Sequence, residues 1–239
     1  MHLTTNALVL RGVEYKERDL ILTLLSPEEG KITATARGAR KKNSPLAAGV
    51  QLFAWSEFVL YQFKGRWVVK EATLVEEFSH LRFDLKKLSL ATYFAQLGEL
   101  LSVEELPQDE LLSLVLNSYH ALGRAIPIGV VKAVFELRVM GISGYAPMLE
   151  GCVVCGSPSP VLPLLDCMGG TLCCRSCGGS GMALNEETIG VMRYILSTDG
   201  KKILTFSISD TTILEKVCEH YLLSQLDQDL RSLTFYKEI

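Results

Sequence analysis

The chain has 239 residues, of which 48% are hydrophobic and 21% charged, with a formal net charge of −3 and seven cysteines. This length fits one large domain or two to three small ones, and the apolar fraction is too high for a disordered chain. No apolar run reaches the roughly 18 residues that span a bilayer, and residues 1–6 lack the features of a secretory signal. We therefore expect a cytoplasmic protein without membrane contact, in which clustered cysteines bind metal more often than they form disulfides.

The charges are unevenly distributed along the sequence. Residues 1–80 carry 11 basic and 9 acidic side chains, whereas residues 81–239 carry 13 basic and 18 acidic ones. Within residues 30–70 a single acid, Glu57, accompanies eight bases, which are Lys31, Arg37, Arg40, Lys41, Lys42, Lys64, Arg66 and Lys70. This stretch predicts a surface that attracts a polyanion, and a solvated basic surface without a partner is the alternative interpretation.

Residues 1–78 have the composition of β-strands. Valine, isoleucine, leucine, threonine and aromatic residues are frequent in five stretches, at residues 5–13, 20–25, 31–37, 50–63 and 67–75. Turn residues separate these stretches, and Lys64-Gly65 between the last two predicts a hairpin. Five strands in so short a segment favour a small closed barrel, such as an OB-fold, over a sandwich.

After Phe78 the apolar residues recur at the spacing of helices. Helices are predicted over residues 80–102, after Asp109, from Pro127, and over residues 186–196 and 211–226. The sequence thus predicts a multidomain α+β protein with an OB-fold at residues 1–79 and a helical domain at residues 80–239. A cysteine-rich insertion is expected at about residues 148–183.

Six of the seven cysteines lie between residues 143 and 183. Cys152 and Cys155 form one C-x-x-C pair, Cys174 and Cys177 form a second, and residues 156–173 separate the pairs. Four thiolates at this spacing predict one structural zinc ion, and they leave no open position for a catalytic water. Cys173 directly precedes Cys174 and is an alternative third ligand. Redox-active thiols, ordinary buried cysteines and a zinc site that no longer binds its metal are the other interpretations of this cluster.

The sequence contains none of the catalytic motifs that we sought. It has no phosphate-binding loop, no dinucleotide fingerprint, no complete nucleophile elbow and no H-E-x-x-H pair, and its four histidines are far apart. We therefore predict that the protein is not an enzyme and has no small-molecule substrate. A nucleic-acid-processing enzyme that uses the zinc ribbon as a clamp is a weaker alternative.

Four segments resemble the RecO family of bacterial recombination mediators and DNA-repair proteins. They comprise residues 7–19, 30–53, 144–156 and 230–233, and the third contains Gly144-Tyr145-Ala146-Pro147 followed, after residues 148–151, by the first C-x-x-C pair. The resemblance implies an N-terminal OB-fold and a helical domain interrupted by a zinc finger. It also implies binding to single- and double-stranded DNA, annealing of complementary strands, and binding to RecR and to the C-terminal tail of single-stranded DNA-binding protein. Such proteins help to load RecA on coated DNA in the cytoplasm, at the nucleoid.

Strand annealing needs phosphate neutralisation rather than covalent chemistry. We expect Lys31, Arg37, Arg40, Lys41 and Lys42 to supply this positive field, and Lys64, Arg66 and Lys70 to extend it. Aromatic side chains suited to base stacking are Phe53, Trp55, Tyr61, Phe63 and Trp67. Most of these fit the barrel core better, and Trp67, next to Arg66, is the preferred stacking residue. The alternative function is a protein-interaction adaptor with a structural zinc finger and a barrel that serves only as a scaffold.

Overall fold

The computed structural model describes residues 1–198, 202–226 and 228–239, which fall into two compact units. The first unit comprises Met1–Gly123 together with Leu230–Ile239, and the second comprises Arg124–Asp229. Among the described residues, no helix combines the length and the apolar character needed to cross a membrane.

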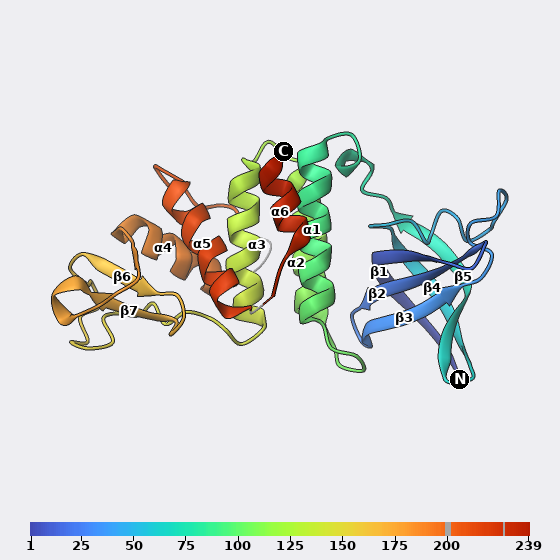
Figure 1. Ribbon diagram of the computed structural model, residues 1–239, viewed down its shortest axis with the longest axis horizontal. Coiled ribbons are helices and arrows are strands. Elements are labelled where there is room, and N and C mark those ends of the chain that lie inside the picture. The colour runs from blue at the N-terminus through green and yellow to red at the C-terminus, as the bar shows by residue number, and fades with distance from the viewer. Residues whose placement is uncertain (199–201, 227) are drawn as a thin grey trace. The chain divides into compact units, whose positions relative to one another are not determined.

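A five-stranded closed barrel forms the N-terminal part of the first unit (Figure 1). Its strands follow one another around the barrel in the order β1-β2-β3-β5-β4, which is the order of an OB-fold. All neighbouring strands are antiparallel except β3 and β5, which are parallel. The strands are β1 (His2–Tyr15), β2 (Asp19–Ser26), β3 (Gly30–Ala36), β4 (Trp55–Phe63) and β5 (Arg66–Glu76). The predicted barrel is confirmed.

Alternating side chains of the strands fill the barrel. On β3, Ile32, Ala34 and Ala36 are buried in the core, whereas Thr33 between them is exposed. The prediction of a strand from residue 50 is wrong, because residues 50–53 form turns and β4 begins only at Trp55. There Phe53 takes a positive φ of 67° and its N–H donates to Val9 O at 2.9 Å, so the segment packs across β1 instead of extending β4.

The turn between β4 and β5 has the predicted form. Lys64 and Gly65 have φ angles of 50° and 74°, as a two-residue hairpin turn of the primed type requires. Glycine adopts this conformation without strain, and the preceding lysine projects from the tip. The hairpin therefore places the basic side chain of Lys64 at the end of the barrel.

Three helices complete the first unit. They are α1 (Leu85–Leu101), α2 (Asp109–Leu122) and α6 (Arg231–Glu238), and a short 3-10 turn, η1 (Ser79–Leu81), precedes them. The carboxylate of Asp84 caps α1 by accepting from the N–H groups of Lys86 and Lys87. Helix α1 packs on the barrel, where Arg11 of β1 makes a bidentate ion pair with Glu99 at 2.7–3.0 Å. This packing joins α1 and α2 to the barrel in one unit, and the domain boundary near residue 79 stays a prediction.

Helix α6 returns from the C-terminal end of the sequence to pack beside α1 (Figure 1). The backbone N–H of Ser232 donates to Gln96 Oε1 at 3.3 Å, and its hydroxyl bonds to the same oxygen. Leu230 and Leu233, on either side of Ser232 in the sequence, are buried. The periodicity of the sequence did not reveal this helix, because its short length gives too short a pattern.

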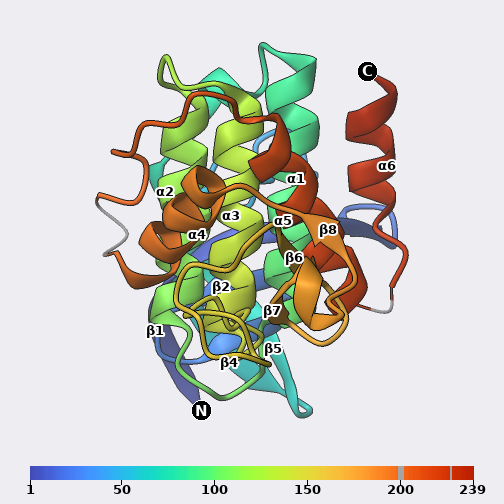
Figure 2. The ribbon, with the colours of Figure 1, turned by 90° about the vertical axis from the view of Figure 1, so that its left-hand side faces the viewer.

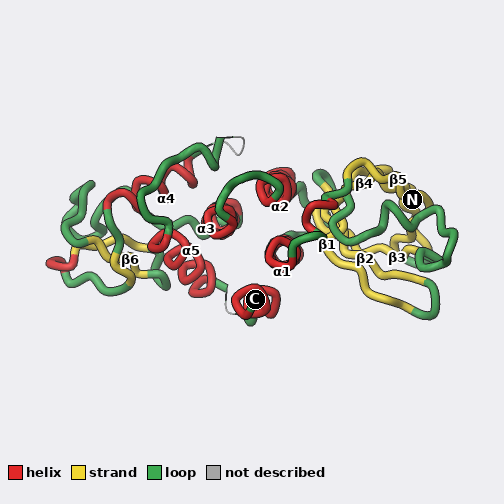
Figure 3. Tube along the Cα trace, turned by 90° about the horizontal axis from the view of Figure 1, so that it is seen from above, coloured by secondary structure: helices red, strands yellow, loops and turns green. Residues whose placement is uncertain are grey.

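The described residues of the second unit form three helices, α3 (Ile128–Ile142), α4 (Glu186–Ser197) and α5 (Thr212–Gln225). Their positions match the predicted segments to within one or two residues, and α3 follows Pro127 as expected. Helices α3 and α5 pack together, and both are labelled in Figure 3, where helices are red. Lys132 of α3 is buried between two carboxylates, Glu136 at 2.7 Å and Glu219 of α5 at 2.8 Å.

The predicted cysteine-rich insertion lies between α3 and α4 and contains a small sheet (Figure 2). Three short antiparallel strands are arranged in the order β7-β6-β8 and are followed or preceded by irregular loops. They are β6 (Pro163–Asp166), β7 (Thr171–Cys174) and β8 (Met182–Ala183), with a 3-10 turn, η2 (Arg175–Cys177), after β7. Such short strands carry no clear alternation, so the sequence did not predict them.

Candidate nucleic-acid interface and metal centre

Three separate turns meet at one end of the barrel. They are the turn between β1 and β2 at residues 16–18, the loop after β3 at residues 37–44, and the β4–β5 turn at residues 64–65. The N–H of Arg40 donates to Arg18 O at 3.0 Å, and the N–H of Gly38 donates to the Asp19 carboxylate at 2.8 Å. These bonds hold the loop after β3 against the β1–β2 turn.

The same loop also reaches the β4–β5 turn. The guanidinium carbon of Arg37 lies 5.1 Å from the centroid of the Phe63 ring, and Lys64 Nζ lies 5.7 Å from it. Phe63 is 48% exposed, so its ring is accessible at the surface between two cations. An exposed aromatic ring beside cations is the combination that binds unpaired bases and phosphates in single strands.

We call the lysine and arginine residues of these three turns the basic cluster. All of them are exposed, and they comprise Lys16, Arg18, Arg37, Arg40, Lys41, Lys42 and Lys64. The acids on the adjoining hairpin are Glu14, Glu17 and Asp19, so the local balance is +4. Arg40 is the only cluster member with an ion pair among the described residues, at 2.8 Å from Glu14. The other bases keep their charge available for phosphates.

Four of the nine residues predicted to bind DNA lie outside the basic cluster. Lys31 is the second residue of β3, about 20 Å from Arg37 by the rise of the strand, and its Nζ donates to Glu99 O at 3.3 Å. Lys70 on β5 pairs with Glu71 at 3.2 Å. Arg66 and Trp67 begin β5 and, with Lys31, line a cleft beside β3.

The aromatic candidates differ in their exposure. Phe53 is 3% exposed and packs edge-on against Tyr119, as a core residue does. Trp55, Tyr61 and Trp67 are half-buried, and Trp67 packs against the barrel core. Phe63 is thus the most exposed of the five and the one within the basic cluster.

Sequence reasoning missed the residues of the β1–β2 turn. Lys16 and Arg18 join the basic cluster, and Tyr15 beside them is 40% exposed with Lys16 Nζ 5.2 Å from its ring. They lay outside the basic stretch at residues 30–70. The signal that identifies them is their position, because the loop between the first two strands of an OB-fold is one of its binding loops.

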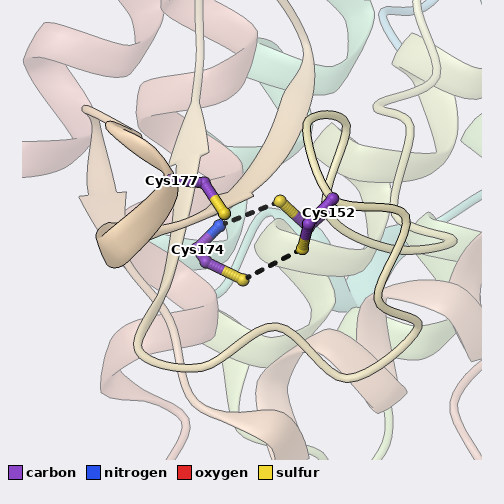
Figure 4. Close-up of side chains that lie close together, drawn as sticks. Cys152, Cys174 and Cys177 are labelled. Carbon is purple, nitrogen blue, oxygen red and sulfur yellow. Dashed lines mark hydrogen bonds between the residues drawn. The ribbon is translucent and has the colours of Figure 1, made fainter.

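The four cysteines of the two C-x-x-C pairs form a compact cluster (Figure 4). The sulfur atoms of Cys152, Cys155, Cys174 and Cys177 all lie within 4.8 Å of one another. The sulfurs of Cys155 and Cys174 are 3.9 Å apart, close to the edge of about 3.8 Å expected for a tetrahedron with metal–sulfur bonds of about 2.3 Å. Figure 4 shows the labelled cysteines, Cys152, Cys174 and Cys177, pointing toward one another. The arrangement is consistent with a metal site.

Backbone geometry favours the thiolate form of one member of this cluster, Cys152. Gly156 and Gly178 follow the two pairs with φ angles of 71° and 84°, which glycine accepts readily. Backbone N–H groups of Cys155 and Cys174 bond to the sulfur of Cys152 and lower the pKa of its thiol to about 5. Amide groups that favour a thiolate suit a site for a soft-ligand metal.

A fifth thiol lies beside the cluster. The sulfur of Cys173 is 3.7 Å from that of Cys152, and Cys173 is buried. Cys167 points instead to Leu165 O at 3.8 Å, and Cys218 is buried in α5. The four sulfurs that lie mutually close include Cys174 rather than Cys173.

Side chains of α4 and α5 hold the cysteine-rich insertion in place. Arg193 of α4 donates to Leu149 O at 2.8 Å and to Pro158 O at 3.2 Å, on both sides of the first C-x-x-C pair. From α5, Tyr221 donates to Tyr145 O at 2.8 Å and Gln225 donates to Cys167 O at 2.7 Å. The insertion is therefore anchored through its backbone carbonyls.

The closed barrel and the four-cysteine insertion place the chain in the class of multidomain α+β proteins with an N-terminal OB-fold and a cysteine finger within a helical part. Two family models match it. The model described as "Recombination protein O N terminal" matches residues 1–78, and "Recombination protein O C terminal" matches residues 82–234. The chain belongs to the RecO family of DNA-repair proteins, which are non-enzymatic recombination mediators.

Relatives of full length support this assignment. The chain is 32% identical to the DNA repair protein RecO of Acetivibrio thermocellus, over 100% of this chain and 97% of the relative. It is also 32% identical to that of Alkaliphilus metalliredigens, over 100% of both chains. For the protein of Desulfitobacterium hafniense (strain DSM 10664 / DCB-2), the identity is 35% over 95% of this chain and 86% of the relative.

Proposed function

We propose that the protein binds single- and double-stranded DNA through the basic cluster, with little dependence on sequence. The observation that carries this proposal is the meeting of three turns that carry seven exposed basic residues, two of which, Arg37 and Lys64, lie over the accessible Phe63 ring. Lysine and arginine side chains contact phosphates, and phosphates are the same in every DNA sequence. Arg37, Arg40, Lys41, Lys42 and Lys64 are the central contacts, and Lys31, Arg66, Trp67 and Lys70 extend the surface.

The same surface supports annealing of complementary strands. Two single strands repel each other through their phosphates, and a cationic surface that binds both lowers this repulsion and raises their local concentration. No proton transfer or covalent step is needed. Lys16 and Arg18, on the β1–β2 turn that the loop after β3 contacts, widen the surface enough to bind more than one phosphate.

Membership of the RecO family supports the rest of the proposed function. The protein acts in the bacterial cytoplasm at the nucleoid, where it binds RecR and the C-terminal tail of single-stranded DNA-binding protein. Together with RecR, the protein helps to load RecA on DNA that is coated by single-stranded DNA-binding protein. The sequence after residue 80 carries 13 basic and 18 acidic residues. This net negative charge suits protein partners better than DNA.

We propose that the cysteine cluster binds one structural zinc ion through Cys152, Cys155, Cys174 and Cys177. The mutual closeness of their sulfurs and the amide groups directed at Cys152 support this assignment. When bound, zinc supplies folding free energy to an insertion whose strands are only two to four residues long. Four thiolate ligands leave the ion no position for substrate.

An annealing assay tests the proposed function. Complementary oligonucleotides coated with the cognate single-stranded DNA-binding protein are mixed with and without this protein, and duplex formation is followed by fluorescence energy transfer. We expect the protein to accelerate duplex formation, and the variant with Arg37, Arg40, Lys41 and Lys42 changed to alanine to lose most of this acceleration. A control variant removes four charges elsewhere, at Lys86, Lys87, Arg124 and Lys216. Equal rates with and without the wild-type protein would contradict the proposal.

A further inference from the structure

The barrel wall is incomplete between β3 and β5. These strands pair at only two positions, Ala34 with Trp67 and Thr35 with Val68, whereas β3 pairs with β2 along its whole length. The first residues of β3 bond to residues 103–105 rather than to β5. There Lys31 N donates to Val103 O at 3.0 Å, and Gly30 forms a β-bridge with Glu104. A cleft of about 420 Å³ lies between these two contacts.

The cleft combines an aromatic wall with polar groups. Trp67 lines it and packs against the barrel core. Thr33 and Thr35 project outward from β3 into the lining, and Gln62 adds an amide. A volume of this size and a lining of one aromatic face with a few hydrogen-bonding groups fit a small planar ligand.

The charges around the cleft limit what that ligand is. Lys31 and Arg66 line the cleft, and three carboxylates, of Glu29, Glu104 and Glu105, line it as well. Carboxylates repel a phosphate, but they accept hydrogen bonds from the N–H groups of unpaired bases, which are the ring N3–H of thymine and the exocyclic amino groups of the other bases. The lining thus favours a base over a phosphate group inside the cleft, while Arg66, next to the β4–β5 turn, suits the phosphate outside it.

We propose that this cleft receives an unpaired nucleobase of single-stranded DNA, stacked on Trp67. The proposal rests on the proposed function, since the basic cluster holds the strand whose base enters the cleft. The turn at Lys64 and Gly65 precedes Arg66 directly, so phosphates at the cluster and a base in the cleft belong to the same strand. A paired base in a duplex stays stacked and cannot enter. The cleft therefore adds to the preference for unpaired strands that the exposed Phe63 ring gives the basic cluster.

The first test compares DNA ligands and needs no change in the protein. Fluorescence anisotropy measures binding of the full chain to oligo(dT), to an abasic strand of equal length and to a blunt duplex at the same salt concentration. We expect binding to oligo(dT) at least about fivefold tighter than to the abasic strand, which is the lower limit for one stacked base. Equal affinity for the two strands would overturn the cleft proposal and leave the proposed DNA binding intact. Failure to bind all three ligands would overturn the proposed function itself.

The second test assigns the base to Trp67. The variants Trp67→Leu and Trp55→Leu each remove one half-buried tryptophan of the barrel, and only Trp67 lines the cleft. We expect Trp67→Leu to weaken oligo(dT) binding at least about fivefold with duplex binding within twofold, and Trp55→Leu to change neither. In a Trp55→Phe chain, oligo(dT) but not the abasic strand is expected to quench the remaining tryptophan emission. Unchanged emission, or an equal loss of single-strand and duplex binding by Trp67→Leu, would overturn the proposal.

Discussion

The guanidinium carbon of Arg37 lies 5.1 Å from the centre of the Phe63 ring, so a cation from the loop after β3 covers an aromatic side chain at the end of β4. This contact joins two parts of the barrel that are well separated in the sequence. It also orders a positive charge beside an exposed ring before any ligand binds. The contact is the centre of the surface that we assign to DNA.

The two arginines of the loop after β3 are expected to contribute unequally to DNA binding. Arg37→Ala removes a cation that has no carboxylate partner among the described residues, so we expect the slope of log affinity against log salt to fall by about 0.7–0.9. Arg40→Ala is expected to change it less, because this guanidinium pairs with Glu14 at 2.8 Å and bonds to Glu17 O at 3.3 Å. Anisotropy titrations at several salt concentrations measure both slopes. A larger effect of Arg40→Ala would contradict the assignment.

Phe63→Leu tests the exposed ring itself. We expect weaker single-strand binding by about 1–3 kcal/mol if one base stacks on this ring, with a smaller effect on duplex DNA. The matched control is Phe83→Leu, because Phe83 is an even more exposed aromatic residue, at 87%, that lies outside the basic cluster. Equal losses of affinity in the two variants would argue against stacking on Phe63.

Single cysteine variants test the metal ligands. We expect Cys174→Ser to lose zinc and to lower the thermal stability of the protein, because it removes one of four mutually close sulfurs. Cys173→Ser and Cys167→Ser are the matched controls and are expected to keep one zinc ion per chain. Metal analysis by mass spectrometry reads out both effects. Retention of zinc by Cys174→Ser together with its loss from Cys173→Ser would assign Cys173 as the ligand.

The buried ion cluster between α3 and α5 predicts a large stability effect. Burial alone would lower the pKa of Lys132, but the charge of Glu136 and hydrogen bonds with Glu136 and Glu219 outweigh burial and raise this pKa above 10.5. Lys132→Met leaves both carboxylates without this cation, and we expect a loss of about 3–5 kcal/mol in the free energy of unfolding. Urea denaturation at pH 7 measures it.

The pH dependence of this cluster has a definite sign. Because the folded-state pKa of Lys132 is raised, its contribution is fully present below pH 10.5 and is lost as the pH rises through the folded value. Lys216→Met, at an exposed position of α5, is the control for removing a lysine. A loss below about 1 kcal/mol for Lys132→Met, or the same loss for both variants, would show that the cluster contributes little.

Local signals were sufficient for much of the fold and for the cysteine cluster. The Lys64-Gly65 turn and the two C-x-x-C pairs each act within a few residues, so their sequence spacing already specifies their geometry. The barrel was predictable because five stretches of strand composition within 78 residues leave few ways of burying their apolar side chains.

Contacts between distant segments were not predictable in the same way. Lys16 and Arg18 join the basic cluster only because the loop after β3 folds back, with Arg40 N bonded to Arg18 O. The cleft beside Trp67 exists because β3 pairs with β5 at only two positions. Near Gly30, at the other end of β3, residues 103–105 form the backbone contacts instead. Helix α6 packs through Ser232 and Gln96, which are 136 residues apart in sequence. Each of these depends on long-range packing rather than on local periodicity.

The most direct test of the central claim is the salt dependence of single-strand binding in the variant with Arg37, Arg40, Lys41 and Lys42 changed to alanine. Thermal melting first confirms that the variant is folded, which is expected because these side chains are exposed. The basic cluster predicts weaker binding and a slope of log affinity against log salt that flattens by up to about one unit for each phosphate that the variant no longer neutralises. Wild-type affinity together with a wild-type slope would contradict the claim that this end of the barrel binds DNA.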